Sequence, residues 1–175
     1  MNLQENIQRI REMMGLDEQS FLQDIMNKVD QDRREKNPYR GKEYNPENTG
    51  DFSDSKVKDV VWRAGGMGLN PKSGGIWFAE NKEDVEKFAW SVRDEKREGK
   101  PYYINLQNPR YYDGFWHGYL QDAESQGREG LMDMLVDDGH DGIIIDTDTW
   151  NDTGDEYSVT SKQYVVFNPE NIKPV

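Results

Sequence analysis

The stretch Gln163-Tyr-Val-Val-Phe-Asn-Pro-Glu-Asn-Ile172 decides the fold of this chain. Four of its first five residues are aromatic or β-branched, which favours a buried strand. The Asn-Pro pair that follows ends the strand, because a residue before proline and the proline itself fit poorly into a continuing ladder. The sequence therefore predicts a last core strand over residues 163–167.

Apolar stretches upstream of this run predict the other strands of the sheet. They cover residues 57–63, 75–79, 102–106 and 142–145. One helix is expected after the second stretch, where Val85, Phe88 and Val92 recur at helical spacing, and another over about residues 122–136. Strands and helices mixed in this order predict an α+β domain.

The first 55 residues differ from the rest in composition. Apolar residues at helical spacing predict one helix over residues 2–14 and a second over about 21–36. Prolines and glycines among polar residues predict a linker over 37–55. We therefore expect two parts, a helical segment with its linker (1–55) and a folded domain (56–175).

Composition and charge exclude several classes of site and partner. The chain has no cysteine, which excludes disulfides, thiolate nucleophiles and cysteine-ligated zinc. Its formal net charge of -12 disfavours broad binding to nucleic acid or to an anionic membrane, since both repel an acidic surface. The sequence shows no apolar run of about 18 residues that would span a membrane, and no secretory signal.

No metal site is expected from the sequence. His117 and His140 are far apart in the chain, so a histidine-rich metal site or a histidine-based triad has little support. The acidic loop over residues 146–156 fails the calcium-loop pattern. Trp150 stands where the fifth position needs an oxygen ligand, and Asn151 where the sixth needs glycine. We interpret this loop as solvated, and under the resemblance described next as a target-recognition loop.

The order of these pieces resembles the ADP-ribosyltransferase superfamily, in particular the compact domains of phage and polyvalent proteins. The matching pieces are residues 61–65, 75–79, 141–144 and 163–172. The resemblance implies a split β-sheet core with flanking helices over residues 56–175. It also implies that NAD binds to the domain as a substrate.

The resemblance implies how the dinucleotide would be held. Arg63 would bind the ribose or the phosphates, because a guanidinium is always charged and contacts phosphate oxygens bidentately. Ala64, Gly65 and Gly75 would let backbone N–H groups approach the pyrophosphate. The alternative for Arg63 is a surface arginine at the end of a strand.

The same resemblance places Trp77 against the nicotinamide ring, for which a flat indole offers area and a face. Neighbouring side chains point to opposite faces of a strand, so Phe78 is expected in the core. The alternative for Trp77 is an ordinary core aromatic.

Gln163 occupies the position where active members of the superfamily usually carry glutamate. A glutamine can hydrogen-bond the ribose but supplies no negative charge to the oxocarbenium-like centre, a loss on the order of 10²–10³ in rate. The sequence leaves open a weakened transferase, a changed chemistry or an inactive fold. Glu156, in the loop before the last strand, is a candidate for the missing carboxylate.

The resemblance implies an NAD-dependent mono-ADP-ribosyltransferase, or a weakened relative, that modifies a host macromolecule, most readily a protein. Nicotinamide would leave in a dissociative step, and a side chain of the target would attack the anomeric carbon. The catalytic residues would be Gln163 and Arg63. The alternative is a catalytically inactive domain that serves as a structural or interaction protein of a virion.

Residues 1–55 resemble the removable segments that direct proteins into tailed-phage heads, where cleavage follows a Leu/Ile-x-Glu pattern. Residues 10–12 and 16–18 both match this pattern. The resemblance implies a phage-encoded protein located in the cytoplasm or in the virion, with phage head proteins as partners in the second case.

Overall fold

The computed structural model describes residues 18–67, 74–93, 97–114, 118–146 and 161–175. The chain divides into two compact units, Met1–Lys36 and Asn37–Val175. In the first unit, α2 (Glu18–Lys36) matches the second predicted helix, and the first predicted helix lies outside the described residues. Along α2, the side chains of Leu22, Ile25, Met26 and Val29 are exposed. None of the helices in the described ranges is long and apolar enough to cross a membrane.

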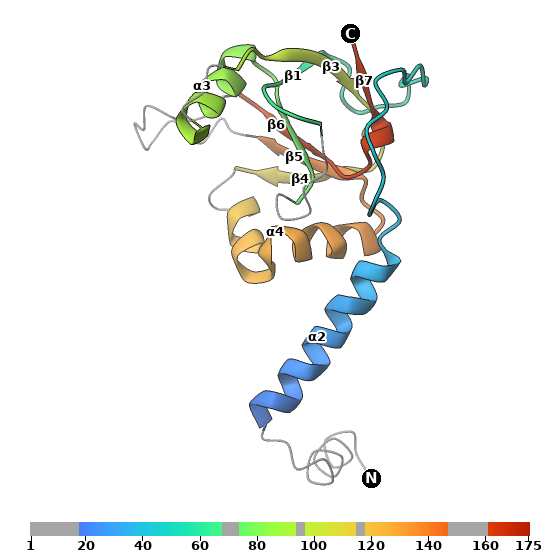
Figure 1. The fold of residues 1–175 in the computed structure, drawn as a ribbon, viewed down its shortest axis with the longest axis vertical. Helices are drawn as coiled ribbons and strands as arrows, with labels where there is room; N and C mark the ends of the chain where they lie inside the picture. The colour runs from blue at the N-terminus through green and yellow to red at the C-terminus, as the bar shows by residue number, and fades with distance from the viewer. Residues whose placement is uncertain (1–17, 68–73, 94–96, 115–117, 147–160) are drawn as a thin grey trace. The chain divides into compact units, whose positions relative to one another are not determined.

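In the second unit, the described residues form seven strands in one mixed sheet, in the order β4-β5-β6-β2-β1-β3-β7 (Figure 1). The strands are β1 (Val61–Arg63), β2 (Ile76–Ala79), β3 (Lys100–Ile104), β4 (Arg110–Asp113), β5 (Gly142–Asp146), β6 (Gln163–Val166) and β7 (Ile172–Pro174). The pair β4–β5 is parallel and the other pairs are antiparallel. The helices are α3 (Lys82–Arg93), α4 (Leu120–Asp137) and the short 3₁₀-helix η4 (Pro169–Asn171). The predicted α+β class is confirmed.

The sheet is weakly joined between β1 and β2. These two strands share one register pair, Trp62 with Ala79, whereas β2 pairs with β6 along its whole length from Ile76 to Ala79. β1 is likewise paired with β3 along its whole length. The sheet is therefore continuous, and its shortest pairing joins one half, β4–β5–β6–β2, to the other, β1–β3–β7.

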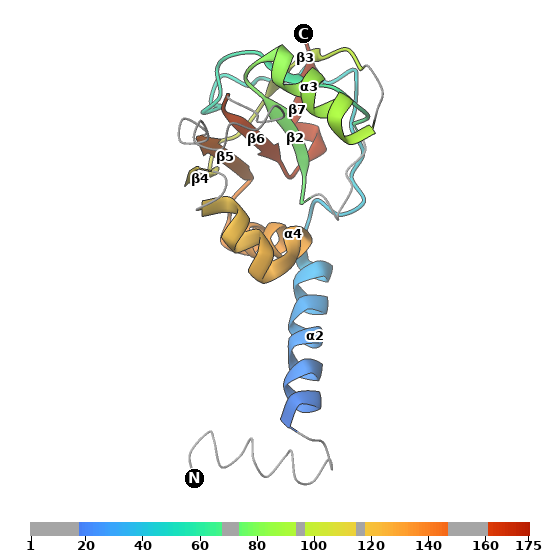
Figure 2. The same cartoon turned by 90° about the vertical axis from the view of Figure 1, so that its left-hand side faces the viewer.

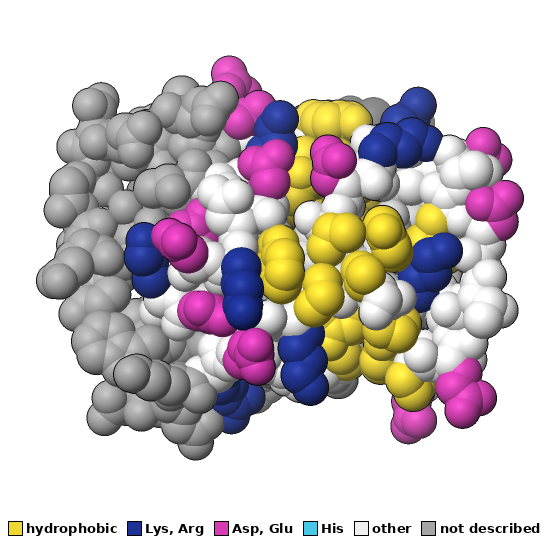
Figure 3. Space-filling view, turned by 90° about the horizontal axis from the view of Figure 1, so that it is seen from above, with side chains coloured by type: hydrophobic (Ala, Val, Ile, Leu, Met, Phe, Trp, Pro, Cys, Tyr) yellow, Lys and Arg dark blue, Asp and Glu magenta, His cyan; other side chains and the backbone are white. Residues whose placement is uncertain are grey.

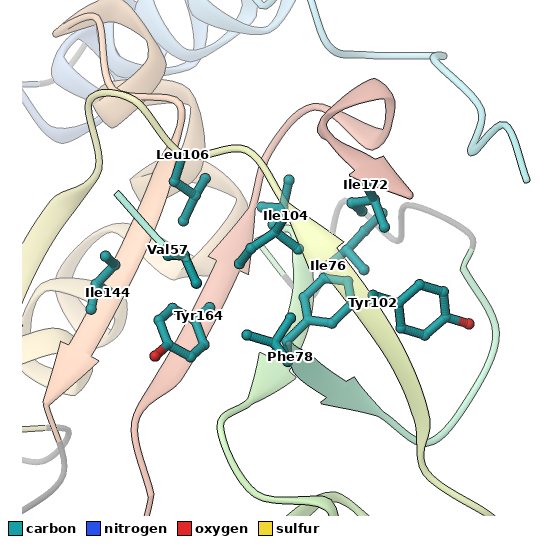
Figure 4. Close-up of a cluster of buried hydrophobic side chains, with 11 residues drawn as sticks. Val57, Ile76, Phe78, Tyr102, Ile104, Leu106, Ile144, Tyr164 and Ile172 are labelled. Carbon is teal, nitrogen blue, oxygen red and sulfur yellow. The ribbon is translucent and has the colours of Figure 1, made fainter. Parts of the chain in front are cut away.

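Strand alternation sorts the buried side chains onto two faces of the sheet. We call the first the Tyr164 face; its cluster (Figure 4) contains Val57, Val61, Ile76, Phe78, Tyr102, Ile104, Leu106, Ile144, Tyr164, Val166 and Ile172. We call the second the α4 face, because α4 lies along it beneath β4, β5 and β6 (Figures 1 and 2). Its cluster contains Tyr112, Tyr119, Ala123, Leu131, Met132, Leu135, Ile143, Ile145, Val165 and Phe167. Each side chain of this size contributes about 1.5–3 kcal/mol when fully buried, so the two clusters fix the sheet.

The surface over the elements at the top of Figure 1 is partly apolar. In Figure 3 hydrophobic side chains gather at its centre, with Lys, Arg, Asp and Glu side chains around them. In the β1–β3–β7 half, the amine of Lys173 lies 4.7 Å from the ring centroid of Phe52 and 5.6 Å from that of Tyr103. Such contacts shield exposed aromatic rings from water.

The folded unit begins at Asn37, earlier than the expected boundary at residue 56. The composition of segment 37–55 predicts a linker, whereas in the structure its polar groups bond to the rest of the unit. Lys42 pairs with Glu170 at 2.6 Å, and the Asn48 amide donates to the carbonyl oxygens of Glu170 and Ile172. In this segment, polar composition thus marks residues that attach to the rest of the unit by hydrogen bonds.

The strongest of these attachments is made to Asp133, which is 2% exposed on α4. The amide of Asn37 donates to Asp133 Oδ1 at 2.6 Å, and Nη2 of Arg40 donates to Asp133 Oδ2 at 2.7 Å. Arg40 also reaches Oε1 of Glu129 at 2.8 Å, on the more exposed side of the network. Buried charged groups are tolerated when they are paired in this way.

We expect Asp133→Ala to lower the free energy of unfolding by about 1.5–3 kcal/mol, because it removes two charge-assisted bonds and strands the buried Asn37 amide. Glu129→Ala is the matched control and should cost at most about 1 kcal/mol, as a partly exposed ion pair does. Urea denaturation of the two variants measures both values. Equal effects would show that Asp133 does not anchor the segment.

Candidate functional site

Two of the predicted site residues, Trp77 and Gln163, share a face of the sheet. In the register of β2 and β6, Trp77 lies opposite Val165 and Gln163 lies opposite Ala79. Directly opposed residues and every second residue along a strand point to the same side. Because Val165 belongs to the cluster under α4, the side chains of Trp77 and Gln163 both project on the α4 face.

Arg63 projects on the opposite face. Its guanidinium carbon lies 5.9 Å from the ring centroid of Phe78, on the Tyr164 face. Nη1 donates to the carbonyl oxygen of Trp77 at 2.7 Å, while Nε and Nη2 donate to that of Gly66 at 3.0 and 2.7 Å. Arg63 therefore bonds to the backbone of Trp77. Its guanidinium lies where the register pairing of β1 with β2 has ended.

Ala64 and Gly65 follow β1 and are partly exposed, and Gly65 has a φ of 142°. Gly75 is buried at the start of β2 with a φ of 131°. A Cβ added there would lie 2.5 Å from Cγ1 of Val165, so glycine allows β2 to begin this close to β6. Residues 68–73, between these two ends of the glycine-rich segment, lie outside the described residues.

Gln163 is a buried polar residue at the start of β6. It is 8% exposed, and its neighbours in register are Ala79 on β2 and Ile145 on β5, both apolar. Its side-chain nitrogen Nε2 is buried and has no hydrogen-bond partner among the described residues. An unmade hydrogen bond of this kind costs about 1–3 kcal/mol.

The chain just before Gln163 is fixed to the start of α3. The amide and hydroxyl of Ser161 donate to Oδ2 of Asp84 at 2.9 and 2.5 Å, and both residues are buried. The backbone N–H of Asn81 donates to the Ser161 hydroxyl oxygen at 3.3 Å. These bonds position Gln163 through its own backbone, and the sequence carries no signal that links the two segments.

Trp77 is the partly exposed end of an aromatic cluster. Its ring meets Tyr119 edge to face with centroids 5.2 Å apart, and Tyr119 meets Tyr112 in the same way at 5.8 Å. Burial raises the pKa of Tyr119 to about 12, an effect that the nearby Arg128 partly offsets. Phe78 is 2% exposed on the other face, so the predicted core position of Phe78 is confirmed.

Arg128 is a candidate site residue that sequence reasoning missed. It lies on α4 directly after Gly127, whose φ of 71° and ψ of 150° interrupt the helix. Its guanidinium carbon lies 5.8 Å from the ring centroid of Trp77. The available signal was the glycine inside an otherwise helical pattern, which often has a packing or functional reason.

Within the described ranges, no three His, Asp or Glu side chains come together as a metal site would require. Nδ1 of His140 lies 3.0 Å from the carbonyl oxygen of Asn108, a contact that belongs to the turn before β5. His117, Glu156 and all of the acidic loop beyond Asp146 lie outside the described residues.

Comparisons with known proteins were made at the level of sequence families, curated proteins and solved structures. None of the three found a match for this chain. The candidate site is consequently defined by its own contacts. Trp77 and Gln163 project on the α4 face, and the Arg128 guanidinium lies over the Trp77 ring. Arg63 bonds to the backbone of Trp77 from the other face.

Replacing Gln163 by methionine should stabilise the free protein, because a side chain of similar shape removes the unpartnered buried donor. We expect the free energy of unfolding to rise by about 1 kcal/mol. Gln163→Glu is the control and should lower it, since a carboxylate in this apolar position would be costly to desolvate. Thermal and urea denaturation measure both. A loss of stability in Gln163→Met would mean that the amide already has its partner.

Proposed function

We propose that this chain is an NAD-dependent mono-ADP-ribosyltransferase of reduced strength, encoded by a phage and directed at a host protein. The observation that carries the proposal is the buried, unpartnered Nε2 of Gln163 on the same face as the partly exposed ring of Trp77. A nicotinamide riboside offers hydroxyl oxygens to the first group and a flat ring to the second. The residue types and their shared face support binding of that end of NAD.

The form of the sheet supports the same proposal. The superfamily is characterised by a split sheet, and here the two halves part after the single pair of Trp62 and Ala79. Arg63 lies at this parting, at the end of the first strand, where the resemblance expects a basic residue. Its bonds to Trp77 and Gly66 favour a role in holding the site together rather than direct contact with phosphate.

The chemistry open to these residues is a dissociative transfer. The bond between the anomeric carbon and nicotinamide breaks first, and a nucleophilic side chain of the target then bonds to that carbon. Gln163 would orient the ribose by donating from Nε2 to a hydroxyl oxygen. Its register neighbours Ala79 and Ile145 bring no charge to stabilise the cationic centre, so the transfer is expected to be slow.

A second candidate function is that of a catalytically inactive virion protein that keeps the fold. The observation that favours it is the exposed stripe of Leu22, Ile25, Met26 and Val29 on α2. Exposed apolar stripes of this spacing are typical of helices that pack against a partner. In this case the partners would be phage head proteins, and the location would be the virion rather than the cytoplasm.

Gln163→Glu separates the two functions. If the site is a weakened transferase, the added carboxylate should raise the release of nicotinamide from NAD by on the order of 10²–10³. The measurement is NAD hydrolysis by the wild type and by the variant under the same conditions. A folded Gln163→Glu variant that stays inactive would favour the virion protein.

The transferase proposal is tested directly by incubating the protein with labelled NAD and a bacterial lysate. We expect the wild type to transfer the label to a protein, and Arg63→Ala to lose most of the transfer because Gly66 and Trp77 are released from each other. Lys162→Ala is the control, since among the described residues the Lys162 side chain forms a single long, exposed ion pair, with Asp146. Absence of any labelled product, with the full chain folded, would contradict the proposal.

A further inference from the structure

Strand alternation leaves the α4 face without the basic residue that the sequence suggested for the phosphates of NAD. Arg63 projects on the Tyr164 face, and its guanidinium donates to two backbone carbonyl oxygens, those of Gly66 and Trp77. A ligand whose ring lies against Trp77 and whose ribose reaches Gln163 occupies the other side of the sheet. The phosphates of such a ligand need a cation on that side.

Arg128 supplies a cation at that place. It is exposed, and its guanidinium carbon lies 5.8 Å from the ring centroid of Trp77. Its positive charge partly offsets the rise in the pKa of Tyr119, which lies against the ring of Trp77. Within the described part of the chain, Arg128 forms neither an ion pair nor a hydrogen bond through its side chain, whereas Arg40 and Arg63 both do.

The helical backbone is interrupted directly before Arg128. α4 changes direction along its length (Figure 1), at Gly127, and a Cβ at Gly127 would meet nothing within 4 Å. Gly74, at the end of the glycine-rich segment, packs directly on Arg128, the residue after Gly127. A Cβ at Gly74 would lie 2.7 Å from the carbonyl oxygen of Arg128 and 3.2 Å from its Cβ. Gly74 therefore packs tightly against the backbone of Arg128, while the exposed guanidinium is of the kind that binds phosphate oxygens.

We propose that Arg128 is the phosphate-binding residue of this site, and that the ligand is a nucleotide whose 5′-phosphate is bound by the Arg128 guanidinium. This inference rests on the proposed function, which supplies the ring and the ribose. The phosphate charge is then recognised by Arg128 on α4 instead of by Arg63 on β1. Arg63 then acts as a positioning residue, through the backbone of Trp77.

The test compares two ligands that differ by one phosphate, nicotinamide mononucleotide and nicotinamide riboside, together with NAD itself. Isothermal titration calorimetry of the full-length wild type should give tighter binding of the mononucleotide than of the riboside. Arg128→Gln should weaken binding of the mononucleotide and of NAD about ten- to hundredfold, as loss of a charge-assisted bond does. Its affinity for the riboside should change less than about twofold, because only the phosphate contact is lost.

Arg110→Gln is the matched control. Arg110 also lies over an aromatic ring, 5.5 Å from the centroid of Tyr112, but on the edge strand β4. The Arg110→Gln variant should bind all three ligands with the affinity of the wild type. The Arg128→Lys variant should recover part of the mononucleotide binding that Arg128→Gln loses. A variant damaged only in packing would lose the riboside and the mononucleotide equally.

The outcomes separate the two proposals. Equal binding of the mononucleotide by Arg128→Gln and the wild type would overturn the role of Arg128 and leave the proposed function standing. Equal weakening of the riboside and the mononucleotide in Arg128→Gln would also overturn it. Absence of NAD binding to the folded wild type would overturn both proposals together.

Discussion

The single pairing of Trp62 with Ala79 is the constraint on which the rest of the structure depends. Where the register pairing of β1 and β2 ends, the Arg63 guanidinium donates to the carbonyl oxygen of Trp77 at 2.7 Å. The same guanidinium holds Gly66 and so fixes one end of the glycine-rich segment. The register of β2 with β6 opposes Trp77 to Val165 and so places the Trp77 ring on the α4 face.

The buried amide of Gln163 affects the stability of the free protein. An unpartnered donor lowers the stability of the free protein, and a ligand that accepts its hydrogen bond recovers that loss on binding. The bonds of Ser161 to Asp84 hold the backbone before Gln163 in place, so the amide stays where it is while it has no partner. Proteins often tolerate such local costs at functional sites, because the site must be formed before its ligand arrives.

The sequence predicted those features that depend on local patterns. Alternation and β-branched residues predicted β2, β5 and β6, and the core position of Phe78 followed from the same alternation. The packing of residues 37–55 was not predictable, because bonds such as that of Asn37 to Asp133 join distant parts of the chain. The opposite faces of Arg63 and Gln163 depend on strand register, and the place of Arg128 depends on the break at Gly127. Neither is a property of a short stretch of sequence.

The central claim is that the Gln163 amide is a donor that waits for a ligand on the α4 face. The most direct test is an NMR titration of the ¹⁵N-labelled protein with NAD, in which the Gln163 side-chain amide is identified by its absence from the Gln163→Met spectrum. The account predicts that both amide protons shift on binding and that their exchange with water slows, because Nε2 gains an acceptor. An amide that stays unchanged while NAD saturates the protein would contradict the account.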